Sequence, residues 1–186
     1  RGNIGFVSGT LDVQGGRIIG DVFGGESSVE KDSEVDFTGD FATEGSFMVD
    51  NISIRPDVTL TLADNLTGAV SNSGTLYVSR ANEERTGPTI FGDYSQEASG
   101  SLKIDLASDT DYTQLVVNGK ASFASNAKIE VNVIGTPELS IGSTINDIVS
   151  VNMGETQKED SENSEDAKPL NSDGFSVSDN GLLYNT

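Results

Sequence analysis

The chain has 186 residues with 30 acidic and 11 basic side chains, and its formal net charge of −19 argues against nucleic acid or an anionic membrane surface as a partner, because both attract Lys/Arg-rich surfaces. It contains no cysteine and no histidine, which excludes Ser-His-Asp and Cys-His catalysis and zinc sites built from those residues. No apolar run approaches the ~18 residues of a transmembrane helix, and the opening at Arg1 has no signal-peptide pattern, so we expect a fragment of a longer protein.

Apolar and polar residues alternate along most of the chain, and no window repeats apolar residues at helical spacing. Alternation with a period of two places successive side chains on opposite faces of a β-strand. The 21 glycines and the low aromatic content of 6% suit tight corners and thin layers. Composition and alternation together predict an all-β protein.

Short strands separated by turns are expected through the first half of the chain. Glycine pairs at 15–16 and 24–25 are interpreted as corners, and no G-x-G-x-x-G spacing supports a phosphate loop. Pro56 lacks an amide donor, so residues 55–57 are expected to form a turn. The strands expected around it cover 35–37, 52–54 and 58–62.

Two polar segments, 65–68 and 71–74, are interpreted as further corners because they combine Asn, Ser, Thr and Gly. Residues 81–88, which read ANEERTGP, have no apolar periodicity. We expect a boundary at this polar segment, which would divide the chain into residues 1–90 and 91–186.

The densest alternation lies between Gly92 and Val133, where three apolar runs of strand length are separated by short polar turns. The runs are Leu102, Ile104 and Leu106; Leu115 and Val117, continuing through Ala121 and Phe123; and Ile129, Val131 and Val133. Three such strands suit a meander, part of a sandwich or one layer of a solenoid, and recurrence of the unit decides among these.

A small residue followed by alternating apolar residues recurs along the chain. The small residues are Gly9, Gly45, Gly74, Gly100 and Ala127, so the spacings are 36, 29, 26 and 27 residues. Near-equal spacing in this range is typical of stacked coils, in which each coil buries its apolar face against its neighbours. With roughly 25 residues per coil, about seven coils ~4.8 Å apart would form a rod of about 35 Å. The recurrence favours a parallel β-helix.

Four motifs carry a family resemblance: GDYSQ at 92–96, GSLKI at 100–104, LVVNGKA at 115–121 and KIEV at 128–131. Together they resemble the autochaperone region at the C-terminal end of pertactin-like autotransporter passenger domains, which are bacterial proteins of type V secretion. The match covers about residues 91–133. Thr113 stands where Asp is common in the family, and Ala127 where Gly is usual.

The resemblance implies a right-handed parallel β-helix whose capping region folds first at the outer surface and promotes the folding and display of the upstream coils of a virulence or adhesion protein. It implies a location at the bacterial cell surface, attached through an outer-membrane barrel that lies outside this chain. The expected partners are that translocator barrel, the upstream passenger coils and an unidentified host protein. We expect no cofactor, nucleic acid or small-molecule substrate.

The residues expected to fill the layers of the capping region are candidates for a folding nucleus. They combine the strand alternation of residues 91–133 with the motifs that carry the resemblance. The candidates are Tyr94, Gln96, Leu102, Ile104, Leu106, Leu115, Val117, Gly119, Phe123, Ile129 and Val131.

Beyond Val133, the apolar residues 145–151 predict one more strand, and 175–184 predict a terminal hairpin folded over the cap. Residues 155–166 contain six acidic side chains and one lysine, with nothing to bury, so a mobile acidic loop is expected at 155–169. A calcium site is the alternative for this run. The order of its carboxylates lacks the D-x-D-x-D-G pattern with its glycine turn.

Two other functions suit an acidic β-helix. The carboxylates of Asp36 and Asp40, or those of Asp105, Asp109 and Asp111, would supply a pair for glycoside hydrolysis, but Asp109 and Asp111 lie in a short turn where Asp serves local hydrogen bonding. We therefore expect no enzymatic activity. The main alternative to the secretion-assisting role is an adhesion or host-protein-binding module on a β-helical stalk.

Overall fold

The computed structural model describes residues 2–24, 32–80, 87–135, 145–152 and 176–179. These residues form eighteen β-strands and no helix, which confirms the prediction of an all-β chain. Accordingly, no described segment is a helix with the length and apolar character needed to cross a membrane.

Eleven strands form the larger sheet, and all its strand pairs are parallel. They are β1 (Ile4–Phe6), β2 (Gly9–Val13), β3 (Val22–Gly24), β4 (Ser33–Phe37), β6 (Phe47–Ile54), β8 (Leu66–Asn72), β10 (Thr89–Phe91), β11 (Tyr94–Gln96), β14 (Leu115–Val117), β15 (Ala121–Phe123) and β17 (Val149–Val151).

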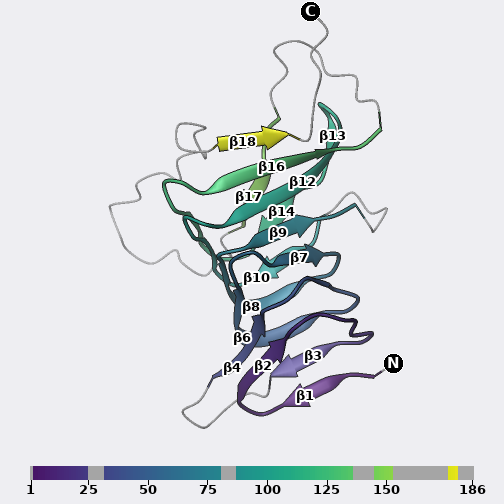
Figure 1. Ribbon diagram of the computed structural model, residues 1–186, viewed down its shortest axis with the longest axis vertical. Coiled ribbons are helices and arrows are strands. Elements are labelled where there is room, and N and C mark those ends of the chain that lie inside the picture. The colour runs from purple at the N-terminus through teal and green to yellow at the C-terminus, as the bar shows by residue number, and fades with distance from the viewer. Residues whose placement is uncertain (1, 25–31, 81–86, 136–144, 153–175, 180–186) are drawn as a thin grey trace, which may run out of the picture.

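Seven of the described strands form the smaller sheet, and among them only β12 and β13 pair antiparallel. They are β5 (Phe41–Ala42), β7 (Thr59–Leu62), β9 (Thr75–Val78), β12 (Ser101–Ser108), β13 (Asp111–Tyr112), β16 (Lys128–Val133) and β18 (Ser176–Asp179). In Figure 1 the strands lie one above another along the long axis, with β1 at one end and β18 at the other.

Inward-facing side chains of successive strands stack in register. In the smaller sheet Leu60, Leu76, Leu102 and Ile129 are consecutive partners, and all four are buried. Neighbouring strands lie about 4.8 Å apart, so each aliphatic side chain covers the next one along the stack. Buried residues of both sheets, among them Leu60, Leu76 and Leu102, form one contiguous hydrophobic core.

The recurring small residues are equivalent only from Gly74 onward. Thr75, Ser101 and Lys128 are partners in the smaller sheet, so the residues before them, Gly74, Gly100 and Ala127, occupy the same corner. Gly9 begins β2 and Gly45 precedes β6, and both of these strands belong to the larger sheet. The prediction that all five mark one repeated corner was therefore wrong for the first two, which match in local sequence but not in position.

The corners predicted at 65–68 and 71–74 were largely wrong, because β8 runs continuously from Leu66 to Asn72. Leu66, Val70 and Asn72 all face the interior and are buried, and the strand is held by its neighbours on both sides. Gly68 has a φ of +129°, and the pairing of β8 with β6 shifts register near this point. Tertiary pairing thus overrides the turn propensity of Asn, Ser and Gly.

Several predicted features lie outside the described residues: most of the polar boundary at 81–88, the acidic loop at 155–169, and the second strand of the terminal hairpin. The strands on either side of the predicted boundary belong to the same ladders, since β9 pairs with β12 and β8 pairs with β10. The first strand predicted for the hairpin is β18, which pairs in parallel with β16.

Candidate functional site

Most of the predicted nucleus residues lie in the core. Phe123 is half-buried, and its ring packs edge-on against Tyr94 with centroids 5.7 Å apart. Gly119 is half-buried in the turn between β14 and β15, where an added Cβ would lie 2.4 Å from the carbonyl oxygen of Gly92. The remaining candidates are buried: Tyr94, Gln96, Leu102, Ile104, Leu106, Leu115, Val117, Ile129 and Val131.

Tyr94 is the centre of a buried polar cluster, which also contains Asn72 and Gln96. Its side chain is 1% exposed, and its hydroxyl donates to Oε1 of Gln96 at 2.9 Å. The same hydroxyl accepts a hydrogen bond from Nδ2 of Asn72 at 3.0 Å. Burial raises the pKa of the Tyr94 hydroxyl above its ordinary value, and the Asn72 hydrogen bond opposes this rise. The hydroxyl therefore stays protonated as a donor across the physiological range.

The two amides of this cluster connect the larger sheet to the smaller one. Asn72 Nδ2 also donates to the Ser101 carbonyl at 2.9 Å. Gln96 Nε2 donates to the Gly100 carbonyl at 3.1 Å and to the Lys128 carbonyl at 2.7 Å. Because buried backbone carbonyls require partners, these bonds fix the position of β8 and β11 against β12 and β16.

The corner beside the cluster explains the recurring glycine. An added Cβ at Gly100 would lie 2.3 Å from the carbonyl oxygen of Asn72, and one at Gly74 would lie 2.3 Å from that of Arg55. Both glycines are buried where the chain passes from one sheet to the other. The close approach of backbones at this corner therefore requires glycine at both positions.

Sequence reasoning found Tyr94 and Gln96 but missed Asn72. Asn72 is the register partner of Gln96 and follows Leu66 and Val70 on the inward face of β8. The available signal was this alternation, which places Asn72 inward. Its Oδ1 atom is buried and has no hydrogen-bond partner within the part of the chain that the structure describes, so the amide is held through its nitrogen.

A second polar cluster lies on the outer face of the smaller sheet around Asp105, which is 2% exposed. Its carboxylate accepts hydrogen bonds from the Tyr77 hydroxyl at 2.6 Å, from Asn132 Nδ2 at 2.6 Å and from the Arg80 backbone N–H at 2.9 Å. Burial, and then the hydrogen bond to Asp105, raise the pKa of Tyr77 to about 12. These contacts join β9, β12 and β16 side by side.

The short β12–β13 hairpin is anchored to this outer cluster. Thr113 Oγ1 donates to the Val78 carbonyl at 2.7 Å and accepts the Asp105 amide at 2.9 Å. The Arg80 guanidinium forms an ion pair with the Asp111 carboxylate through two hydrogen bonds, one of them 2.9 Å long. A threonine is well suited to this position because its hydroxyl can donate and accept at once.

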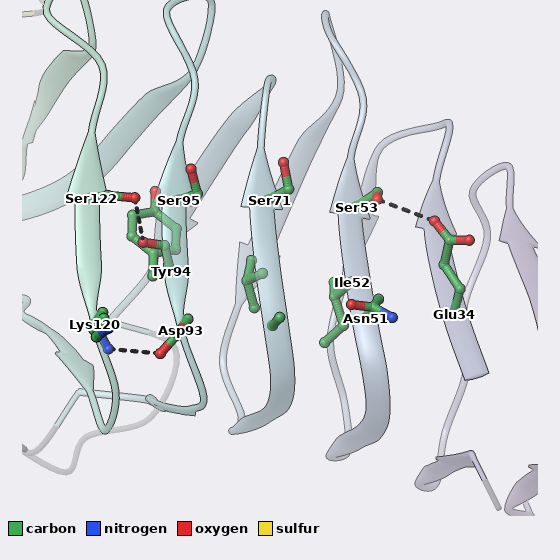
Figure 2. Close-up of a pocket in the computed structure, with 12 residues that line it drawn as sticks. Glu34, Asn51, Ile52, Ser53, Ser71, Asp93, Tyr94, Ser95, Lys120 and Ser122 are labelled. Atoms are coloured by element: carbon green, nitrogen blue, oxygen red, sulfur yellow. Dashed lines mark hydrogen bonds between the residues drawn. The ribbon is translucent and has the colours of Figure 1, made fainter. Parts of the chain in front are cut away.

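The outer face of the larger sheet carries an open groove of about 530 Å³. Figure 2 shows the groove crossing β4, β6, β8, β11 and β15, with a row of serine side chains along it. Glu34 lies toward one end, and Asp93 and Lys120 lie toward the other.

The carboxylates considered for catalysis have structural partners. Asp36 forms an ion pair with Arg55 at 2.7 Å, and Asp40 accepts the backbone N–H of Thr59 at 2.7 Å. Asp105 and Asp111 belong to the outer cluster described above. Within the described residues, no group of acidic side chains is arranged to hold a metal ion. The acidic run considered for calcium lies outside those residues.

Comparison with known proteins identifies no relative: no family model matches the sequence, and neither a curated protein nor a solved structure matches the chain. A function for this chain therefore rests on its own residues and geometry.

Proposed function

We propose that this chain is the C-terminal part of an autotransporter passenger at the bacterial surface, folded as a right-handed parallel β-helix. In this proposal residues 91–133 fold first and promote the folding and display of the upstream coils. The translocator barrel and those coils are its partners. The support comes from the sequence motifs at 92–131 together with the contacts of the same residues.

The β-helical part of the proposal is supported by the strand order. From β4 onward, parallel neighbours are joined by connections that leave one sheet, contribute a strand to the other and return. Connections between parallel strands of one sheet are right-handed in about 98% of cases. Stacked, in-register strands with a shared core are what a wound chain of this kind requires.

The folding role is supported most by one observation, the buried cluster of Asn72, Tyr94 and Gln96. Two of these residues belong to the proposed nucleus, and the third lies on the upstream strand β8. A nucleus that has already folded would present to β8 both a free strand edge, formed by β11 and by Phe91 at the end of β10, and a tyrosine hydroxyl awaiting its donor. Pairing of β8 then satisfies both the strand edge and the hydroxyl. Each upstream strand is thus positioned by the next strand downstream.

The proposal is tested by matched Leu→Ala substitutions. Leu115 on β14 and Leu60 on β7 are both fully buried, and each substitution should cost about 2–5 kcal/mol. Leu115→Ala should leave residues 1–90 sensitive to protease and reduce surface display of the full-length protein. Leu60→Ala should loosen its own layers while residues 91–133 stay resistant. Limited proteolysis with mass spectrometry, and antibody detection on intact cells, measure the two effects.

Val117→Asp places a charge in the same layer as Leu115 and should abolish upstream folding altogether, because an unpaired charge in the core is strongly disfavoured. A directional nucleus would be contradicted if Leu60→Ala made residues 91–133 as sensitive to protease as Leu115→Ala makes residues 1–90. Folding and display that persist in both core variants of β14 would favour a binding module on a stalk instead.

A further inference from the structure

The groove on the larger sheet exists because β8 presents short side chains between taller neighbours. Asn51 on β6 and Ala69 on β8 are register partners, and Asp93 lies one residue before Tyr94, the partner of Val70; Ala69 is the smallest of the three. Lys120, just before β15, continues this row, since Asp93 and Lys120 directly precede the partners Tyr94 and Ala121. The row is therefore high at both sides and low at β8, which forms the floor of the groove.

The next outward row consists of serines alone. Ser53, Ser71, Ser95 and Ser122 are consecutive register partners on β6, β8, β11 and β15. Strands lie about 4.8 Å apart, so the four hydroxyls form an evenly spaced line across the sheet. Figure 2 shows them side by side along the groove.

These hydroxyls are weakly engaged by the protein. The Ser71 hydroxyl has no hydrogen-bond partner among the described residues. Ser53 donates to Glu34 at 3.4 Å and Ser122 to the Tyr94 carbonyl at 3.4 Å, both longer than a normal O–H···O bond of about 2.5–3.0 Å. Ser95 donates to Glu97 at 3.1 Å. Each hydroxyl both donates and accepts, so the row offers unused hydrogen-bonding capacity to a ligand.

We propose that this groove binds a segment of a neutral glycan, lying across the strands with its hydroxyl groups on the serine row. A chain of sugar rings presents hydroxyls that donate and accept at intervals, which matches a regular row of serines. The volume of 530 Å³ falls within the range of ligand pockets, about 300–1,000 Å³. This role is independent of the proposed folding role.

Charge selects among polar ligands. The chain carries −19, so an anionic polymer would meet long-range repulsion. A cationic peptide would require free carboxylates along the floor, but the floor carries Ala69 and Ser71, while Glu34 and Asp93 lie toward the two ends. The Asp93 carboxylate also accepts the Lys120 backbone N–H at 2.9 Å. A neutral, hydroxyl-rich ligand fits this distribution.

The test is a titration of the full chain, followed by NMR amide shifts, with maltohexaose, cellohexaose and chitohexaose, each raised to about 10 mM, well above a Kd of about 1 mM. Hexagalacturonate and hexalysine serve as the anionic and cationic comparators. At least one neutral hexasaccharide should shift the amides of residues 51–53, 69–71, 93–95 and 120–122, with little change elsewhere. Neither comparator should shift this set.

Two variants separate binding from folding. Ala69→Gln fills the floor, and Ser71→Ala removes the unpartnered hydroxyl; both should weaken binding, Ala69→Gln by at least about tenfold. Thr61→Gln, a similar change on the outer face of β7, should bind like the parent chain. Thermal melts confirm that each variant is folded. Absence of shifts with every neutral hexasaccharide, equal affinity in Ala69→Gln, or binding only of a charged comparator would overturn the proposal.

Discussion

The interior of the molecule differs between its upstream layers and residues 91–133. Upstream, the rings of Phe37, Phe41 and Phe47 pack together with centroids 5.4–6.0 Å apart, and all three are buried. Downstream, the corresponding space holds the Tyr94 hydroxyl, which accepts a hydrogen bond from Asn72 and donates one to Gln96. The change can be followed along one set of inward-facing register partners on successive strands, which are Phe37, Ile54, Asn72 and Gln96.

The difference bears on how register is chosen. Apolar side chains attract one another without direction, so phenylalanines stabilise a layer but tolerate several arrangements. A buried hydroxyl and two amides are satisfied in few arrangements, and an unmade hydrogen bond there is costly. We infer that the downstream cluster sets the register and that the upstream layers supply burial.

The largest effect should come from removing an upstream ring. Phe37→Ala should lower the free energy of unfolding by about 3–5 kcal/mol, because a buried aromatic leaves a large cavity. Since its layer forms late in this account, the unfolding rate should rise while the refolding rate changes little. Denaturant stopped-flow kinetics measure both rates. Phe91→Ala is the control, because Phe91 is 44% exposed and should change stability by no more than about 0.5 kcal/mol.

The next effect tests the downstream cluster. Tyr94→Phe removes one hydroxyl and leaves Asn72 and Gln96 short of a partner, which should cost about 1–3 kcal/mol. In contrast to Phe37→Ala, most of this loss should appear as slower refolding. Tyr112→Phe, which removes a hydroxyl bonded to the Asn146 carbonyl at an exposed site, should leave refolding unchanged. A Tyr94→Phe variant that refolds at the parent rate would remove the cluster from the nucleus.

Alkaline pH should weaken the outer cluster. The pKa of Tyr77 is raised to about 12 by burial and by Asp105, whereas an unfolded tyrosine ionises near pH 10. The folded chain then holds a proton that the unfolded chain has lost, so stability should fall as pH rises from about 10 to about 12. Urea unfolding across this range measures the slope. The decline should be shallower in Tyr77→Phe, and identical slopes would show that Tyr77 ionises as freely in the folded chain.

The smallest effect should come from acid acting on an upstream carboxylate. The Ser33 hydroxyl and backbone N–H hydrogen-bond to Asp50 and lower the pKa of its carboxyl group. This contribution is present above the unfolded pKa of about 3.9 and is lost as pH falls through the lower folded pKa. Asp50→Asn should therefore show a weaker acid dependence than the parent chain in thermal melts from neutral pH to about pH 3. If Asp50→Asn lost stability in acid as steeply as the parent chain, the acid dependence would come from other carboxylates.

Much of the fold could be predicted from alternation. The inward residues of β12, β14 and β16 alternate strictly, so their burial followed from the sequence. The strand β8 could not be recognised, because its residues favour turns when considered alone and only its neighbours hold them extended. The equivalence of Gly9 and Gly45 with the later corners failed for the same reason, since local similarity does not specify which sheet a strand joins.

The candidate sites were less predictable because they depend on contacts between distant residues. Asn72 receives its partners from residues 22 and 29 positions away in the sequence. The floor at Ala69 is low only relative to its register partner Asn51 and to Asp93, which lies beside it just before β11. Tyr94 and Gln96 were found because a motif and an alternating pattern coincided there, a signal that Asn72 and Ala69 lacked.

The order in which the two regions form is the central claim, and pulsed hydrogen exchange during refolding of the full chain measures it directly. Amides of β11, β12, β14 and β16 should become protected first, followed by β8 and β9, and last by β3, β4 and β7. Protection that begins around Phe37 and Phe47 and reaches Tyr94 last, or that develops simultaneously in both regions, would contradict the account.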